Sequence, residues 1–447
     1  MNFPKKITLT PSRTLILGFA AIILFGACLL ALPFASRDGQ SLGFLSALFT
    51  ATSATCVTGL VVVDTYTQFT LFGQVVILAL IQIGGLGFMT LALFFPMALG
   101  RRIGLRERSV LMESVSAPQL GGVIRLMRHV LIGTLLIEGT GAILLALRFI
   151  PRFGFRTGLW YGVFHAISGF CNAGFDLLGV VEPYSSITHF ADDPVIVLTL
   201  CALIAIGGIG FIVWEDVVRN GVHLRRYSFH AKVVLLGTAI LIVGGTVILF
   251  LSERNTVLSG LTAPQRLLRA LFQSVSPRTA GFNSVDIAAL SQCGAFTVIF
   301  LMFIGAAPGS TGGGIKVSTA AVLFSTVYSH IRGAEDTNLM HRRVAPETVR
   351  KALCAVTLYV MLCLGGVFVI LLLQDLPLKD VLLECFSAIG TVGLSTGITR
   401  SLAPLSRVVL IALMFAGRVG SLTVFMTVAE RESESRLRNP VEKIVVG

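Results

Sequence analysis

The fold is decided by the hexapeptide Thr55-Cys56-Val57-Thr58-Gly59-Leu60 and by three related segments further along the chain. Each segment follows an apolar run and places a glycine before a large apolar residue. The other three segments are Phe170-Cys171-Asn172-Ala173-Gly174-Phe175, Pro277-Arg278-Thr279-Ala280-Gly281-Phe282 and Gly390-Thr391-Val392-Gly393-Leu394-Ser395. Their glycines are spaced 115, 107 and 112 residues apart. Such regular spacing indicates four copies of one structural unit.

The composition places these units in a membrane. Of 447 residues, 54% are hydrophobic and only 13% are charged, with a mean hydropathy of +0.86. Soluble domains carry about 25% charged residues, so this chain is predicted to cross a membrane several times. The net charge of +12 does not indicate nucleic acid, because the basic residues gather between the apolar runs. The apolar run from Leu15 to Leu32 is long enough to be a retained first spanning helix instead of a cleaved signal.

Each unit is predicted to contain a spanning helix, a short re-entrant helix, a loop and a second spanning helix. The predicted fold is an all-α membrane protein with eight spanning helices and four re-entrant pore helices around a central pseudo-fourfold pore. The predicted helices and loops are 13–32, 41–54, 55–64 and 69–98 in unit one; 124–149, 157–170, 171–178 and 194–218 in unit two; 230–251, 264–276, 277–287 and 292–330 in unit three; and 347–373, 378–389, 390–398 and 405–430 in unit four. The corresponding divisions of the chain are 1–105, 106–225, 226–340 and 341–447, the last including a C-terminal tail.

The basic residues of the loops predict the orientation. They precede the first helix and fall between successive units, as positive charge does on the cytoplasmic side of membrane proteins. The residues are Lys5, Lys6, Arg101, Arg102, Arg106, Arg108, Arg219, Arg225, Arg226, Lys232, Arg332, Arg342, Arg343, Arg350 and Lys351. Both termini are therefore expected in the cytoplasm, and the four glycine loops are expected to open outward.

The glycine loops have the chemistry of a cation filter. A cation that enters a pore exchanges hydration water for protein oxygens, and rings of backbone carbonyls provide these for potassium. Glycine permits the backbone angles that turn a carbonyl inward. Threonine hydroxyls at Thr55, Thr58, Thr279 and Thr391 add oxygens or support the loop. The predicted filter residues are Val57, Thr58, Gly59, Asn172, Ala173, Gly174, Thr279, Ala280, Gly281, Thr391, Val392 and Gly393, with potassium at the four glycines.

The four loops are not identical, which predicts an imperfect filter. Only unit four has the Thr-Val-Gly core of tetrameric potassium channels, while Cys56, Cys171 and Asn172 break the symmetry. Fewer well-formed ion sites and looser discrimination against sodium are expected. Asp64, Asp176 and Asp286 follow three of the glycines. Two interpretations remain open for them: an acidic outer vestibule, or turn caps and partners of Arg278.

The second helices carry small residues in equivalent positions, with one exception. Aligned on the repeat, Gly85, Gly208 and Ala306 share a ring with Arg418. An arginine inside a membrane is costly and usually faces a cavity or a partner. Arg418 is therefore predicted to project into the pore as an electrostatic barrier. The alternative is neutralisation by a buried acid such as Glu138 or Glu384.

The second helix of unit three cannot be regular. The stretch from Phe303 to Lys316 contains a proline and five glycines, which break helices. It lacks the P-loop pattern, because Lys316 does not directly follow a glycine. The interpretation is a mobile intramembrane gate loop. The predicted gate residues are Gly305, Gly309, Gly312, Gly313, Gly314, Lys316 and Arg418.

Taken together, the four loops, the glycine-broken helix and Gly417-Arg418-Val419-Gly420 resemble the Trk/Ktr/HKT superfamily of potassium transporters, most of all its Ktr branch. The resemblance implies potassium uptake across the plasma membrane, filter glycines at the four positions above, a gate loop at 305–316 and a pore arginine at Arg418. It also implies a homodimer, supported by the apolar tail Val441 to Gly447. The dimer would dock on a cytoplasmic ring of KtrA-type nucleotide-binding (RCK) subunits. Sodium activates some relatives, and no organic cofactor is expected.

Two other functions are consistent with parts of the sequence. A secondary carrier for another solute, such as a sodium-coupled amino acid carrier, also has broken helices, but its repeats usually number two and are often inverted. Rescue of a potassium-uptake-deficient strain would separate that carrier from a potassium pathway. A membrane enzyme would need a complete catalytic site. His165 and Ser168 lie three residues apart, but no acid or nucleophile motif accompanies them.

Overall fold

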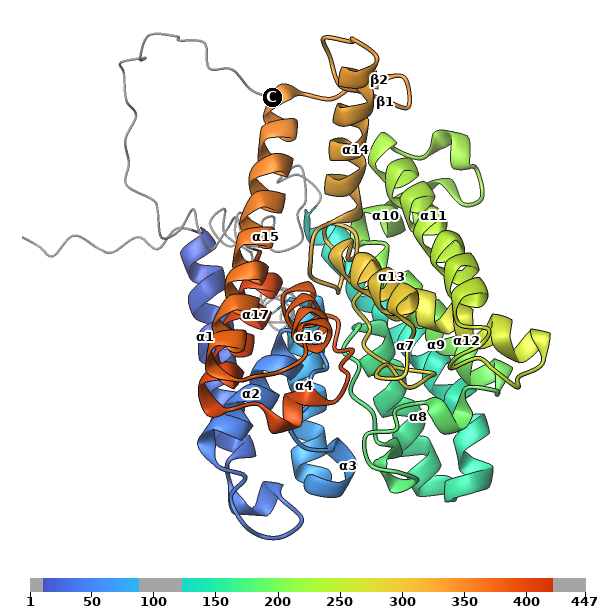
Figure 1. Cartoon of the computed structure of the whole chain (residues 1–447). Helices are drawn as coiled ribbons and strands as arrows, with labels where there is room; N and C mark the ends of the chain where they lie inside the picture. The colour runs from blue at the N-terminus through green and yellow to red at the C-terminus, as the bar shows by residue number, and fades with distance from the viewer. Residues whose placement is uncertain (1–10, 88–122, 421–447) are drawn as a thin grey trace, which may run out of the picture.

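The helices of the protein repeat one pattern four times (Figure 1). The computed structural model describes residues 11–87 and 123–420. In each unit a long helix precedes a short helix, a turn and a second apolar helix. The long helices are α1 (Pro11–Leu30), α7 (Val123–Phe153), α11 (Phe229–Ser252) and α15 (Pro346–Leu373). The short helices are α2 (Phe44–Thr55), α8 (Phe155–Phe170), α12 (Ala263–Val275) and α16 (Leu378–Gly390), close to the predicted ranges.

The long helices confirm that the chain crosses a membrane several times. Within the described ranges, four helices have the length and apolar composition needed to cross a bilayer, and a fifth span is possible if a bent pair is counted as one. Large apolar side chains on their outer faces remain open to the surroundings, such as Leu135, which is 74% exposed, and Leu372, which is 75% exposed. Lipid would cover these faces in the membrane.

The second helices differ from the prediction in unit two. The predicted continuous helix 194–218 is wrong, because α9 (Pro194–Gly208) and α10 (Phe211–Asn220) meet at an angle of 98°. Gly210 has a φ of +91° at the break. The Phe211 N–H donates to the Gly309 carbonyl of unit three at 2.7 Å instead of to its own helix. A contact from another unit thus replaces the helical hydrogen bond.

The second helix of unit three is broken, as predicted. It consists of α13 (Gln292–Phe303) and α14 (Val317–Ile331), with a non-helical stretch between them. In units one and four the second helices are α4 (Leu71–Leu86) and α17 (Pro404–Val419). The predicted continuations to residues 98 and 430 lie outside the described residues, as do Lys5, Lys6, the four arginines from 101 to 108 and the apolar tail from 441.

Smaller elements connect the helices. They are η1 (Pro33–Ala35), α3 (Thr65–Gln68), η2 (Leu178–Val180), η3 (Thr188–Phe190), η4 (Leu224–Arg226), β1 (Asn338–Leu339), β2 (Arg342–Arg343) and η5 (Ile398–Ser401). The strands β1 and β2 form an antiparallel pair, with Asn338 opposite Arg343.

The units pack around a closed circle. Each second helix contacts the short helix of the next unit: α4 contacts α8, α9 contacts α12, α13 contacts α16, and α17 returns to α2. Figure 1 shows α17 and α2 next to each other although they lie at opposite ends of the chain. Buried apolar residues fill these junctions; Phe49 of α2 and Leu410 of α17, for example, belong to one cluster and are fully buried. The first and last units thereby close the arrangement.

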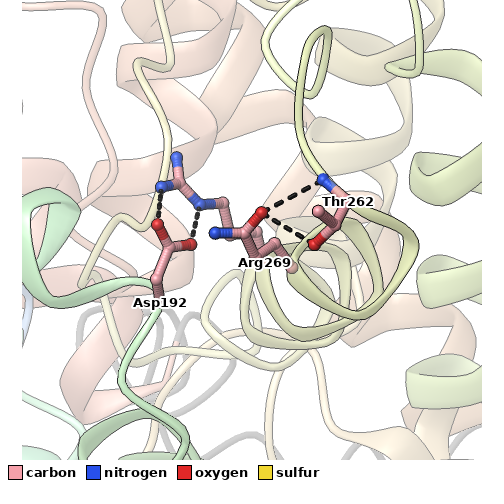
Figure 2. A network of polar contacts seen from close by, with 4 residues as sticks. Asp192, Thr262 and Arg269 are labelled. Carbon is pink, nitrogen blue, oxygen red and sulfur yellow. Dashed lines mark hydrogen bonds and ion pairs between the residues drawn. The ribbon is translucent and has the colours of Figure 1, made fainter.

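The short helix of unit three is held by polar contacts at its start and at its middle (Figure 2). At its start, Thr262 and Gln265 form a capping box, in which the Gln265 side-chain oxygen accepts from the Thr262 N–H at 3.0 Å. Further along, the Arg269 guanidinium donates two hydrogen bonds, each of 2.9 Å, to the carboxylate of Asp192 in unit two. This bidentate pair fixes α12 against the neighbouring unit.

Candidate functional site

The structure brings the four glycine turns together. A Cβ atom added to Gly59 would lie 2.5 Å from the Ala173 carbonyl oxygen of unit two, and one added to Gly174 would lie 2.6 Å from the Ala280 carbonyl oxygen of unit three. The relation continues from Gly281 to the Val392 carbonyl and from Gly393 to the Thr58 carbonyl. One carbonyl oxygen from each unit therefore lies against the glycine of the preceding unit in the circle, and the four form a closed ring.

The backbone of each turn has an unusual conformation at two positions. The four glycines have φ values of +91°, +71°, +80° and +96° in chain order. The residue two positions earlier is also left-handed, although it carries a side chain: Val57 (+56°), Asn172 (+58°), Thr279 (+76°) and Thr391 (+50°). Such conformations cost about 1–3 kcal/mol each and cluster where function requires them. Their recurrence in all four units singles out these turns.

A serine in the last turn of the short helix, or directly after it in unit three, supports each turn, and the sequence did not reveal this feature. Ser53 and Ser387 accept with their hydroxyl oxygens from the N–H groups of Gly59 (3.0 Å) and Gly393 (2.9 Å). In units two and three the hydroxyl donates instead, from Ser168 to the Phe175 carbonyl at 2.6 Å and from Ser276 to the Phe282 carbonyl. The serine lies six residues before the glycine in three units. In unit three it lies five residues before, and this shift conceals the repeat.

The threonines predicted to support the turns have different surroundings. Thr391 Oγ1 accepts from the Gly313 N–H at 3.0 Å, and Thr279 Oγ1 hydrogen-bonds to the side-chain amide of Asn172 at 3.0 Å. The buried hydroxyls of Thr55 and Thr58 have no hydrogen-bond partner among the described residues. Only some of the threonines therefore act as supports.

A cavity of about 170 Å³ lies beyond the glycines, on the side toward which the turns continue. Asp64, Asp176 and Asp286 all line it. Each also accepts from a backbone N–H: Asp64 from those of Thr67 and Tyr184, Asp176 from that of Leu178, and Asp286 from that of Ala288. Each aspartate therefore both caps a turn and lines the cavity beyond the glycines. The interpretation as turn caps and the interpretation as an acidic vestibule are thus compatible. The suggested pairing with Arg278 is wrong, because Arg278 donates to Thr238 Oγ1 at 3.2 Å.

The glycine-rich loop of unit three lies against the opposite ends of the turns. Its two ends are joined by a hydrogen bond from the Gly305 N–H to the Ile315 carbonyl, of 2.8 Å. Ala307 donates to the Gly208 carbonyl at 2.9 Å, and the Thr311 hydroxyl donates to the Phe170 carbonyl at 3.2 Å. The loop therefore fills the space between the break in unit two and the turn of unit four.

Two cationic side chains, Arg418 and Lys316, hydrogen-bond to the glycine-rich loop. The Arg418 guanidinium donates to the carbonyls of Thr311 and Gly84, and to that of Gly85 at 3.1 Å. The Lys316 ammonium donates to the carbonyls of Gly312 (2.7 Å) and Gly313 (3.3 Å). Arg418 thus links units one, three and four by backbone carbonyls alone, while Lys316 holds the loop of its own unit.

The buried acids considered as partners of Arg418 have other contacts. Glu138 accepts from the Gln82 amide at 3.2 Å and contacts the thiol of Cys171. Glu384 accepts from the hydroxyls of Ser395 and Thr399. Within residues 11–87 and 123–420, no ion pair between Arg418 and a carboxylate is found. Among the described residues, the positive charge of Arg418 is therefore not neutralised by a buried carboxylate.

Two arginines near the C-terminal end of α7, Arg148 and Arg152, have partners at the protein surface. Arg148 forms an ion pair with Asp193 at 2.7 Å. The Arg152 guanidinium lies 4.7 Å from the centre of the Phe190 ring. These contacts hold the end of α7 to the loop that precedes α9.

Comparison with known proteins identifies the family. The family model described as "TrkH: Cation transport protein" matches residues 10–438, which is nearly the whole chain. The chain belongs to the TrkH family of cation transport proteins. Members of this family are transporters and not enzymes, which agrees with the absence of a catalytic motif in the sequence.

Relatives and a solved structure support membership of the TrkH family. The chain is 39% identical to the Ktr system potassium uptake protein B of Bacillus subtilis, over 99% of this chain and 98% of that protein. It is 38% identical to the potassium/sodium uptake protein NtpJ of Enterococcus hirae, over 98% of each. The crystal structure of the potassium transporter TrkH from Vibrio parahaemolyticus has the same fold, with a TM-score of 0.74 and 19% identity, covering 95% of this chain and 86% of that one.

Proposed function

We propose that the chain mediates potassium uptake across the plasma membrane through a filter made by the four glycine turns. The closed ring of carbonyls from Thr58, Ala173, Ala280 and Val392 supports this proposal best, because carbonyl oxygens replace the hydration shell of a potassium ion. The ends of the short helices also bring partial negative charge toward the ring, which favours a cation. The names of relatives that are 38–39% identical over almost the full chain point to the same ion.

In this proposal each of the divisions 1–105, 106–225, 226–340 and 341–447 is one pore unit. Eight spanning helices and four re-entrant helices would then surround a pseudo-fourfold pore, with both termini in the cytoplasm. The glycine-rich loop and Arg418 would form the gate below the filter. The chain would form a homodimer controlled by a cytoplasmic ring of KtrA-type RCK subunits, which would bind the nucleotide. A relative named as part of a Ktr system supports the presence of partner subunits. Sodium is the candidate activator, and no organic cofactor is required.

The function is tested by comparing potassium, rubidium and sodium uptake into vesicles that contain the purified protein. We expect potassium and rubidium to enter at similar rates and sodium more slowly, with weaker discrimination than in a symmetric tetrameric channel. The reason is that the four turns differ in sequence, and only one has the Thr-Val-Gly core. Vesicles without protein give the background. If none of these cations enters the vesicles, the proposed function is excluded. If the protein selects potassium over sodium as strongly as a tetrameric channel does, the looser selectivity predicted from the unlike turns is wrong.

Shortening the glycine-rich loop is expected to increase potassium uptake. Removal of residues 309–312 eliminates the Gly309 carbonyl that holds Phe211 and the Thr311 carbonyl that holds Arg418. Ser310→Ala is the matched control, since among residues 11–87 and 123–420 the Ser310 hydroxyl donates only to the Ala307 carbonyl within the same loop (2.6 Å). Initial rates of rubidium uptake, normalised to the amount of protein in the vesicles, provide the measurement. Unchanged or slower uptake by the deletion variant would contradict a gating role for the loop.

A further inference from the structure

A buried polar residue lies behind each glycine turn, three residues before the supporting serine. These residues are Thr50, His165, Gln273 and Glu384. All four are at most 2% exposed. Burial of a polar side chain costs free energy unless its hydrogen bonds are made. The contacts of each residue therefore indicate what it does.

Glu384 ties its helix to the segment that leaves the fourth turn. One carboxylate oxygen accepts from the Ser395 hydroxyl at 2.8 Å, and the other accepts from the Thr399 hydroxyl. Ser395 Oγ in turn accepts from the Gly397 N–H at 2.8 Å. Ser395 and Thr399 both line the cavity at the mouth of the ring. The carboxylate thus holds the outer end of this turn against α16.

His165 makes the corresponding tie in unit two. Its Nδ1 lies 2.7 Å from the carbonyl oxygen of Tyr161, which can only accept, so Nδ1 carries the proton. Nε2 is then free to accept from the Leu177 N–H at 3.4 Å. Leu177 lies three residues after Gly174, in the segment that leaves the second turn. The neutral imidazole therefore connects α8 to the outer end of its own turn.

The equivalent side chains of units one and three make no such tie, although the Ser284 hydroxyl of unit three donates to the Arg269 carbonyl of α12 at 3.2 Å. The Thr50 hydroxyl donates to the Ser46 carbonyl of its own helix at 2.9 Å. The Gln273 side-chain amide has no hydrogen-bond partner in the part of the chain that the structure describes. In the ring, units two and four face each other across the centre, because the glycine contacts run from unit one to two, three, four and back to one. The two tied turns are therefore opposite each other.

We propose that His165 and Glu384 are positioning residues that hold two opposite turns apart and so determine how well the ring distinguishes potassium from sodium. A smaller ion is bound closely only if the carbonyls move inward. The ties that His165 and Glu384 make at the outer ends of opposite turns resist that movement, whereas Thr50 and Gln273 add no such resistance in units one and three. This inference rests on the proposed function of the ring as a filter.

The test compares alanine variants at equivalent positions of the repeat. Glu384→Ala and His165→Ala are each expected to lower the ratio of potassium to sodium uptake by about tenfold, the size that the loss of a hydrogen bond of about 1.4 kcal/mol would give. Gln273→Ala is the matched control, because it removes a buried side chain of similar size that has no partner. The ratio of potassium to sodium uptake in Gln273→Ala is expected to equal that of the unchanged protein. The ratio is measured in one preparation of vesicles, so it does not depend on the amount of folded protein.

A conservative variant separates positioning from packing. Glu384→Gln keeps the shape of the side chain and one acceptor oxygen, so its ratio is expected to lie between those of the alanine variant and the unchanged protein. The inference is overturned if the ratio is unchanged in both Glu384→Ala and His165→Ala, or if Gln273→Ala lowers it equally. If Gly59→Ala also leaves uptake and selectivity normal, the filter proposal itself fails. If Gly59→Ala abolishes uptake, an unchanged potassium-to-sodium ratio in Glu384→Ala and His165→Ala rejects only this inference.

Discussion

Gly59→Ala is expected to lower potassium uptake by about a hundredfold or more, equivalent to about 2.7 kcal/mol in the transport barrier. The added Cβ would lie 2.5 Å from the Ala173 carbonyl oxygen, so that oxygen would have to retreat by roughly 1 Å to reach an ordinary van der Waals distance. This oxygen is one of the four in the ring, and in the proposed filter its displacement would remove an ion ligand. The φ of +91° adds strain for any residue with a side chain.

A glycine with the same backbone requirement but open surroundings provides the control for Gly59→Ala. Gly260 has a φ of +72°, and a Cβ added there would have no neighbour within 4 Å. Gly260→Ala is expected to reduce stability by about 1–2 kcal/mol while leaving uptake unchanged. Both variants are compared by rubidium uptake at equal amounts of protein in the membrane. Normal uptake and selectivity in Gly59→Ala would exclude the ring as the ion path.

Arg418→Ala is expected to raise potassium uptake by about tenfold. The guanidinium holds the Thr311 carbonyl of the glycine-rich loop and the Gly84 and Gly85 carbonyls of unit one, so its removal releases the loop. Hydrogen bonds from a charged group contribute about 1.5–3 kcal/mol each, and 1.4 kcal/mol is equivalent to a factor of ten. Removal of the positive charge also lowers the barrier for a cation in a low-dielectric pore.

Arg407→Ala serves as the control for Arg418→Ala. Arg407 lies on the same helix and also donates to backbone carbonyls, those of Leu402 and Arg400, but it contacts neither the glycine-rich loop nor unit one through these bonds. Its replacement is expected to leave uptake near that of the unchanged protein. Arg418→Lys keeps the charge without the fork of donors, and we expect uptake between those of arginine and alanine. If Arg418→Ala folds normally and transports at the original rate or more slowly, the gate role is rejected.

The sequence predicted the repeat and the glycine turns because local chemistry determines both. Left-handed positions need glycine, and four such positions at similar spacing cannot be mistaken for isolated loops. The break in unit three was predicted for the same reason, since a proline and five glycines cannot continue a helix. Both features require only the residues of one segment, so periodicity and composition were sufficient.

The break in unit two could not be predicted in the same way. The segment at this break, Gly207-Gly208-Ile209-Gly210, is very similar to Gly84-Gly85-Leu86-Gly87 of unit one. Its composition therefore did not distinguish a continuous helix from a bent one. The bend depends on the Gly309 carbonyl, which lies about 100 residues away in the chain. Similarly, Arg418 has backbone carbonyls as partners, and no sequence pattern marks a carbonyl as a partner. Long-range backbone contacts of this kind appear only in the folded chain.

The contact between Gly393 and the Thr58 carbonyl has a consequence for the synthesis of the protein. A ribosome makes the first unit early and the last unit at the end, so this seam forms only when the C-terminal unit has entered the bilayer. A nascent chain that contains three units lacks this seam, so the proposed ring is incomplete until the fourth unit is in place. We therefore expect no selective ion uptake before the last quarter of the chain has entered the bilayer.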